Sequence, residues 1–142
     1  MSEEMLSVLR FHDYEVDQMA FIRNHNFDVE KEEVELKFNF ASEVHMSKDK
    51  SKAIVVMTCR LFDEDFSKND VPFYLLLTMR GYFNCKDADI EDFELNAMAI
   101  LMPYIRSTIT SFTAQAGIPP VILPPVNVYH LLEKQNPTEP ID

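Results

Sequence analysis

Hydrophobic and polar residues alternate most clearly along residues 33–40. Apolar side chains occupy every second position, with Glu, Lys or Asn between them: Val34, Leu36, Phe38 and Phe40. A period of two places the apolar side chains on one face, which is typical of a half-buried antiparallel strand. The polar run at residues 47–52 predicts a turn after this strand.

Three further segments predict strands. Residues 53–62 are apolar on both faces and rich in β-branched residues, which favours a central strand. Residues 71–84 predict a long fourth strand, in which Gly81 marks either a bulge or a close backbone approach. The apolar residues of 5–27 fit no single alternation, so this first strand is expected to be interrupted or bulged. Four consecutive strands joined by polar turns predict an antiparallel meander.

The period changes after Asp89. Apolar residues then recur at spacings of three and four, which predicts a helix that Gly117 ends as a C-cap. Pro103 is expected to kink this helix or to split it into a short and a longer one. Because the helix is apolar over most of its girth, it is expected to need a second apolar surface besides the sheet. A partner subunit is the simplest source of that surface.

Proline pairs dominate the chain after the helix. Residues 119–120 and 124–125 are Pro-Pro, which holds the connection extended. Asn127 is expected to cap a short helix at 128–135. The polar tail 137–142 is expected to be disordered, so residues 1–136 form the single predicted domain. The predicted fold class is α+β: a four-stranded antiparallel meander sheet followed by a long, kinked helix and a short C-terminal helix.

Composition narrows the classes of function. The chain of 142 residues carries a formal net charge of −11, which disfavours nucleic acid and anionic membrane surfaces as partners. No run approaches the roughly 18 apolar residues of a membrane helix, so no membrane insertion is expected. The acidic start lacks the features of a signal peptide, and a cytoplasmic protein is expected.

Candidate chemistry is sparse. The histidines show no metal-ligand spacing: His12, His25, His45 and His130. Only two glycines occur, which argues against a glycine-rich nucleotide loop. Cys59 and Cys85 are expected to be buried free thiols, because the predicted hairpin places Cys59 opposite Leu75, too far from Cys85 for a disulfide. No catalytic residue, cofactor or metal is therefore predicted, and the protein is not expected to be an enzyme.

A family resemblance rests on residues 101–132. This stretch contains four motifs in order: Pro103-Tyr104-Ile105-Arg106, Ile109-Thr110-Ser111, Pro119-Pro120 and Pro125-Val126-Asn127. It resembles the C-terminal half of the SecB family, tetrameric export chaperones that hold unfolded chains. The order of elements agrees along the whole chain, and clear side-chain identity covers its last third. The resemblance implies a SecB-like fold and a homodimer or tetramer.

The resemblance also implies a groove for client polypeptides. Leu36, Phe38, Phe73 and Tyr104 match the parts that line client grooves in the family. With neighbouring apolar residues they form the predicted peptide-binding set: Val34, Leu36, Phe38, Phe40, Phe73, Tyr82 and Tyr104. The alternative is that these residues form the core beneath the helix. Burying a Leu or Phe contributes roughly 1.5–3 kcal/mol, so a few client side chains can offset the ordering of a bound segment.

The function hypothesis is an ATP-independent, chaperone-like protein that binds unfolded or extended polypeptides in apolar grooves, with a link to protein export left open. One alternative is a scaffold or interaction protein with a single dedicated folded partner. Another is a small-molecule binder or enzyme that uses the crevice between sheet and helix. Docking of the translocation motor is not expected, because the family's acidic patch early in the fourth strand is replaced here by residues 73–77, which contain no acid.

Overall fold

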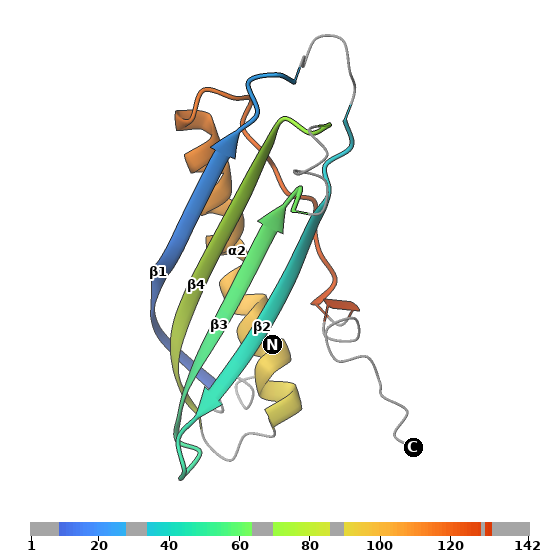
Figure 1. Ribbon diagram of the computed structural model, residues 1–142. Coiled ribbons are helices and arrows are strands. Elements are labelled where there is room, and N and C mark those ends of the chain that lie inside the picture. The colour runs from blue at the N-terminus through green and yellow to red at the C-terminus, as the bar shows by residue number, and fades with distance from the viewer. Residues whose placement is uncertain (1–8, 28–33, 64–69, 86–89, 129, 132–142) are drawn as a thin grey trace.

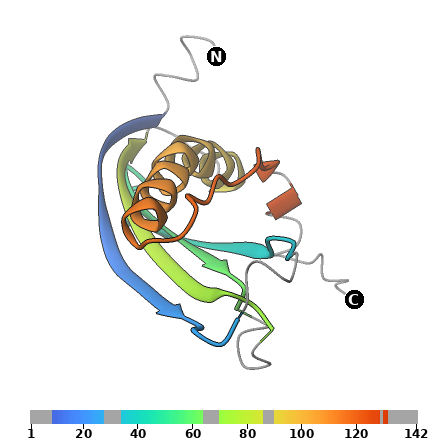
Figure 2. The same cartoon turned by 90° about the horizontal axis from the view of Figure 1, so that it is seen from above.

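The computed structural model contains one curved sheet and one long helix (Figure 1). It describes residues 9–27, 34–63, 70–85, 90–128 and 130–131. The elements follow in the order β1 (Leu9–Arg23), β2 (Phe38–Met46), β3 (Lys52–Leu61), β4 (Phe73–Cys85) and α2 (Ile90–Gln115). The sheet wraps around the helix, which lies against its concave face (Figure 2). The predicted four-stranded antiparallel sheet with a helix after it is confirmed.

The strand order across the sheet is β1-β4-β3-β2. Strands β2, β3 and β4 form the predicted meander, whereas β1 pairs with β4 at the edge opposite β2. The connection from β1 to β2 covers residues 24–37, which is longer than a hairpin turn and crosses from one edge of the sheet to the other. The meander prediction is therefore corrected for β1.

Strand β1 contains the predicted bulges. The register against β4 shifts between Phe11 and Asp13 and again between Val16 and Gln18. Each extra residue shifts the alternation of the strand by one position, so the helix-facing residues are odd-numbered up to Phe11, even-numbered at Tyr14 and Val16, and odd-numbered again from Met19. The apolar residues of β1 that pair with core-facing residues of β4 therefore all lie on the helix side of the sheet: Leu9, Phe11, Tyr14, Val16, Met19 and Phe21. Two one-residue insertions explain why these positions fit no simple alternation in the sequence.

One strand boundary and one strand pairing differ from the sequence prediction. Strand β2 begins at Phe38, so Val34 and Leu36 precede it. Cys59 pairs with Leu77 and not with Leu75, because an error of one residue in the centre of a hairpin shifts its pairing by two. Both cysteines are free and buried, as predicted. The predicted turn at 47–52 is confirmed by a hydrogen bond of 2.9 Å from the Ser47 amide to the Lys52 carbonyl.

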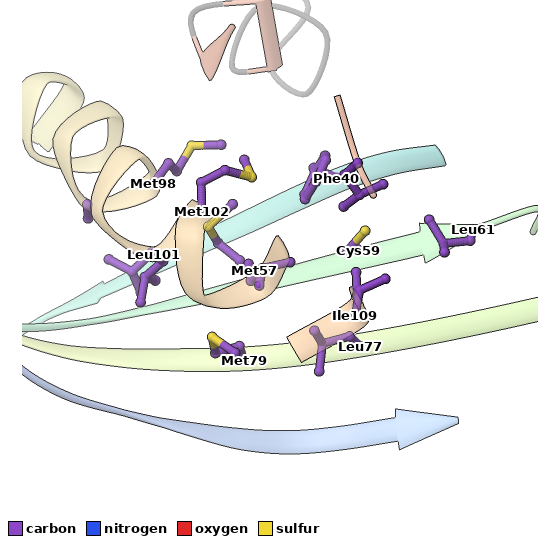
Figure 3. Close-up of a cluster of buried hydrophobic side chains, with 14 of the residues drawn as sticks. Phe40, Met57, Cys59, Leu61, Leu77, Met79, Met98, Leu101, Met102 and Ile109 are labelled. Atoms are coloured by element: carbon purple, nitrogen blue, oxygen red, sulfur yellow. The ribbon is translucent and has the colours of Figure 1, made fainter. Parts of the chain in front are cut away.

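Helix α2 runs without interruption through Pro103, so of the two alternatives predicted at this residue, a kink or a split, the split does not occur. Its core-facing residues include Leu101 and Ile109, which lie against the central strands in Figure 3, and Met98, whose sulfur accepts a hydrogen bond from Ser42 of β2. These side chains are completely buried within the single chain. The second apolar surface that was expected from a partner is supplied by the curved sheet and by Leu123, which belongs to the same core cluster.

The chain turns back after the helix. Gly117, with a φ of 88°, ends α2 as predicted. The following segment runs back beside the helix on the β2 side of the molecule (Figures 1 and 2). The amides of His130 and Leu131 donate to the Asn127 carbonyl at 3.1 and 3.2 Å, which begins the predicted short helix. The rest of that helix and the predicted disordered tail lie outside the described residues.

Candidate functional site

Two apolar hollows lie between residues 34–41 and residues 118–131. The first has a volume of about 310 Å³, and its lining includes Val34, Leu36, Phe62, Phe73, Val121 and Ile122. The second has a volume of about 590 Å³, and its lining includes Phe38, Phe40, Pro125, Val126, His130 and Leu131. Because neighbouring parts of the same two segments form the walls of both hollows, they are together called the apolar groove.

The first wall of the groove, residues 34–41, is tied to the end of β3. The Phe62 amide donates to the Lys37 carbonyl at 2.9 Å. Phe62 has a φ of 62°, in the left-handed region, where a non-glycine residue is strained by roughly 1–3 kcal/mol. This conformation turns the chain so that the Phe62 ring packs edge-on against Phe73, with ring centroids 5.1 Å apart. Backbone hydrogen bonding and ring packing together hold this wall in place.

The second wall is the segment of residues 118–127, called the strap. Its two proline pairs fix φ and lack an amide proton, so they keep the strap extended. Between them, successive side chains point in opposite directions. Leu123 is only 1% exposed and inserts into the core, whereas its neighbour Ile122 is 73% exposed. The strap thus combines an anchor in the core with an uncovered apolar side chain at the groove.

The groove is electrically neutral. Among the described residues that line it, none is Asp, Glu, Lys or Arg, and His130 is the only titratable residue. Apolar burial needs no particular sequence in the bound molecule, and each buried aliphatic or aromatic side chain contributes roughly 1.5–3 kcal/mol. This lining suits the apolar side chains of another polypeptide better than it suits a reaction that needs an acid, a base or a nucleophile.

The structure brings five of the seven predicted binding residues to the groove: Val34, Leu36, Phe38, Phe40 and Phe73. Phe40 and Phe73 are only 8% and 4% exposed, so they also belong to the core. Both alternatives considered for these residues, groove lining and core, therefore hold for Phe40 and Phe73. Val34, Leu36 and Phe38 retain exposed surface and form the accessible part of this wall.

The other two predicted residues lie elsewhere, which corrects the expectation of one shared groove. Tyr82 lines a separate hollow with His12 and His45, and a hydrogen bond to Glu15 raises the pKa of its hydroxyl. It alternates with the core-facing residues of β4 and so lies on the face away from the helix. Tyr104 lies beside β1, where its ring centroid is 4.6 Å from that of Tyr14. Strand β1 is the edge opposite β2, so Tyr104 is distant from the groove.

Sequence reasoning missed the strap and the end of β3 as groove walls. Four of the lining residues that it missed are Phe62, Val121, Ile122 and Val126. One signal was available, because no Asp, Glu, Lys or Arg occurs from residue 107 to residue 132. Apolar residues between two proline pairs in so long an uncharged stretch indicate a surface that contacts other polypeptide.

Other kinds of site receive little support. Within the described residues, no group of three or more His, Cys, Asp or Glu side chains could hold a metal ion. Burial raises the pKa of the Cys59 thiol to about 12, which keeps it protonated and unreactive at neutral pH. The part of the chain that the structure describes contains no helix with the length and hydrophobicity needed to span a membrane.

Comparison with known proteins places these features in a family. The family described as preprotein translocase subunit SecB matches residues 16–139. An uncharacterised protein of Methanocaldococcus jannaschii, MJ0357, is 36% identical over 126 residues, covering 84% of this chain and 79% of that protein. The protein-export protein SecB of Nitrosomonas europaea is 32% identical over 126 residues, covering 80% of this chain and 78% of that protein.

A solved structure shares the fold. It is the Mycobacterium tuberculosis SecB-like chaperone Rv1957, in complex with a ChAD peptide from the Rv1956 HigA1 antitoxin. It superposes with a TM-score of 0.64 at 17% sequence identity, covering 87% of this chain and 95% of that chain. The resemblance inferred from residues 101–132 is thereby confirmed for the family and for the fold.

Proposed function

The chain belongs to the SecB family, and we propose that it is a chaperone-like protein that holds unfolded or extended polypeptides in the apolar groove without ATP. The observation that carries this proposal is the groove itself, whose described lining is apolar and bears no formal charge. Ile122, at 73% exposure, leaves a large apolar side chain in solvent beside it. Apolar surface left uncovered in this way marks a site that other molecules cover.

The shape of the groove favours an extended client. Both walls are themselves extended segments, residues 34–37 and the strap, and the two hollows follow one another along them. A client segment running between the walls could place one group of apolar side chains in each hollow. Such binding is governed by side-chain size and hydrophobicity, so it accepts many sequences. This tolerance is what a protein that holds unfolded chains requires.

Self-association is part of the proposal. Val16 is 48% exposed, and it lies with the exposed rings of Tyr14 and Tyr104 on the helix side of the sheet, along the β1 edge. This surface, called the β1-edge patch, is separate from the groove. A dimer that covers the patch, or a tetramer built from two such dimers, would leave the groove open to clients.

Docking of a translocation motor through an acidic patch is not part of the proposal. At the start of β4, Tyr74 pairs with Ile22, and Leu76 lies between Ala20 and Arg60. These side chains form an apolar and partly basic surface on the outer face of the sheet. Its chemistry is opposite to the acidic surface that the export chaperones present to the motor, so a role in export would require a different contact.

The test is suppression of aggregation of a chemically denatured model substrate by the purified protein. Replacing Leu36→Asp and Phe38→Asp together places two charges in the groove, and we expect it to abolish the suppression while thermal unfolding stays cooperative. Ile22→Asp on the outer face introduces the same charge at an exposed apolar position and serves as the control. Full activity of the double variant would contradict the groove as the binding site.

Affinity capture from a cell lysate separates this function from a scaffold with one dedicated partner. A holding chaperone should retain many proteins, each in a small amount, and lose them when Leu36→Asp and Phe38→Asp are present. Recovery of one protein in a fixed ratio, unaffected by these two changes, would favour the scaffold.

A further inference from the structure

We propose that Arg106, Thr110 and Thr113 of α2 are positioning residues that hold the strap against the helix and thereby set the width of the apolar groove. The inference rests on the proposed function, because it assigns to these three residues the geometry of the client site. None of the three was among the predicted binding residues, and none lines either hollow of the groove.

The three side chains form a polar ladder along one face of the helix. The Thr110 hydroxyl donates to the Val121 carbonyl at 2.7 Å, and the Val121 amide donates to the Thr113 hydroxyl at 2.8 Å. One turn earlier, Nη2 of Arg106 donates to the Leu123 carbonyl at 3.0 Å. Positions three and four apart lie on the same face of a helix, so the ladder follows directly from the sequence spacing.

The proline pairs explain why the ladder meets the strap where it does. Residues 119–120 and 124–125 have no amide proton, so the amides that can be bound in the middle of the strap belong to residues 121–123. Both backbone groups of Val121 are taken up by the two threonines. The helix side chains thus replace the neighbouring strand that an extended segment would otherwise need.

Thr113 is the central member of the ladder. It is the only completely buried polar residue among the described part of the chain. Its hydroxyl accepts a hydrogen bond from the Val121 amide and donates one to the Ile109 carbonyl at 2.8 Å. The hydroxyl proton and one oxygen lone pair are therefore both engaged. Because Thr113 is completely buried, removing its hydroxyl would take away the side-chain acceptor of the Val121 amide, and that bond holds this part of the strap against the helix.

The ladder holds the strap along the first hollow and at Leu123, between the two hollows. Val121, which both threonines bind, lines the first hollow with Ile118, Pro119 and Ile122. The second hollow is lined by Pro125, Val126, Asn127, His130 and Leu131. The chain just before the strap is fixed independently, because Nη2 of Arg23 donates to the Ala116 carbonyl at 2.6 Å. The opposite wall is tied to Phe62. Together with Leu123, which is inserted in the core, the ladder therefore decides how far the middle of the strap stands from residues 34–38.

The experiment compares Thr113→Val, which keeps the shape and removes the hydroxyl, with Thr113→Ser, which keeps the hydroxyl. Thr108→Val is the matched control, since the Thr108 hydroxyl is exposed and donates to the Tyr104 carbonyl within the helix. Two quantities are measured well below the unfolding temperature. One is the amide hydrogen-exchange rate of Val121, and the other is the Kd for fluorescein-labelled, reduced and carboxymethylated α-lactalbumin, a permanently unfolded probe.

We expect Thr113→Val to accelerate exchange at Val121 by about tenfold and to raise the Kd by about fivefold or more, as loss of one buried hydrogen bond implies. Thr113→Ser and Thr108→Val should stay within about twofold of the unaltered protein. If Thr113→Val fails to fold, Thr110→Val is used in its place. It removes the donor to the Val121 carbonyl, and the freed strap should again show faster exchange at Val121 and a higher Kd.

Two results would overturn the inference. Unchanged exchange at Val121 would show that the ladder does not hold the strap, and faster exchange with an unchanged Kd would show that it does not position the client site. Failure of the unaltered protein to bind the probe is a different result. That failure would overturn the proposed function, and with it the role of the ladder in client binding. Slow exchange at Val121 in the same protein would still show that the ladder holds the strap.

Discussion

A Cβ atom on Gly81 would lie 2.7 Å from Cδ2 of Leu101. Strand β4 and helix α2 therefore approach so closely that only a hydrogen fits between them. Of the two alternatives predicted for Gly81, the structure shows the close approach. Leu101 is completely buried, so its side chain could move aside only by displacing its neighbours in the core. This contact fixes the distance between the sheet and the helix near the middle of α2.

Gly81→Ala is expected to lower the free energy of unfolding by about 1–3 kcal/mol, because the added methyl overpacks the core. The double variant Gly81→Ala with Leu101→Ala should lose less unfolding free energy than the two single variants together. Removal of the Leu101 side chain relieves the crowding, and the methyl added at position 81 partly fills the cavity that remains. Urea denaturation of the two single variants and the double variant measures this coupling. Strict additivity would show that the two residues do not crowd each other.

Asp49 gives the β2–β3 turn a specific pH dependence. Hydrogen bonds from Ser51 and Ser47 lower the pKa of its carboxyl from 3.8 to about 2. Because the folded pKa lies below the unfolded value, the stabilisation is present above pH 3.8 and is lost as the pH falls toward 2. The difference in unfolding free energy between the unaltered protein and Asp49→Asn, measured in urea at several pH values, should shrink over this range. A constant difference would contradict the assignment.

The two cysteines should differ in reactivity. Burial raises the pKa of the Cys59 thiol to about 12. Burial also raises the pKa of the Cys85 thiol, which donates to the Lys50 carbonyl at 3.2 Å near the end of the sheet. At pH 8 in the folded protein, we expect a thiol-reactive chromophore to label Cys85 slowly and Cys59 not at all. Cys85→Ala should therefore show no reaction until urea unfolds it, and rapid labelling of that variant would contradict the burial of Cys59.

The β1-edge patch predicts the behaviour of the protein in solution. Val16→Asp with Tyr104→Asp places two charges on this patch and should shift a dimer or tetramer toward monomer in sedimentation velocity at micromolar concentration. Ile22→Asp, on the outer face of the same strand, should leave the assembly unchanged. If the unaltered protein sediments as a monomer, the patch does not mediate self-association.

Much of the fold was accessible from the sequence because its signals are local. The alternation at Val34 to Phe40 identified an extended segment, although regular pairing starts only at Phe38. The polar run after Met46 marked a real turn, and Gly117 marked the end of the helix. The site was accessible in part, since five predicted residues do line the groove.

The sequence by itself determined which segments are extended, which is helical and which side chains are apolar, because alternation, turn residues and prolines act over a few neighbouring positions. Only the tertiary structure decided that β1 crosses to the far edge, that Tyr82 and Tyr104 leave the groove, and that the strap completes it. The physical reason is that strand pairing and wall-to-wall contact join residues distant in the chain. A single inserted residue, as at the bulges of β1, changes the face on which every later side chain lies.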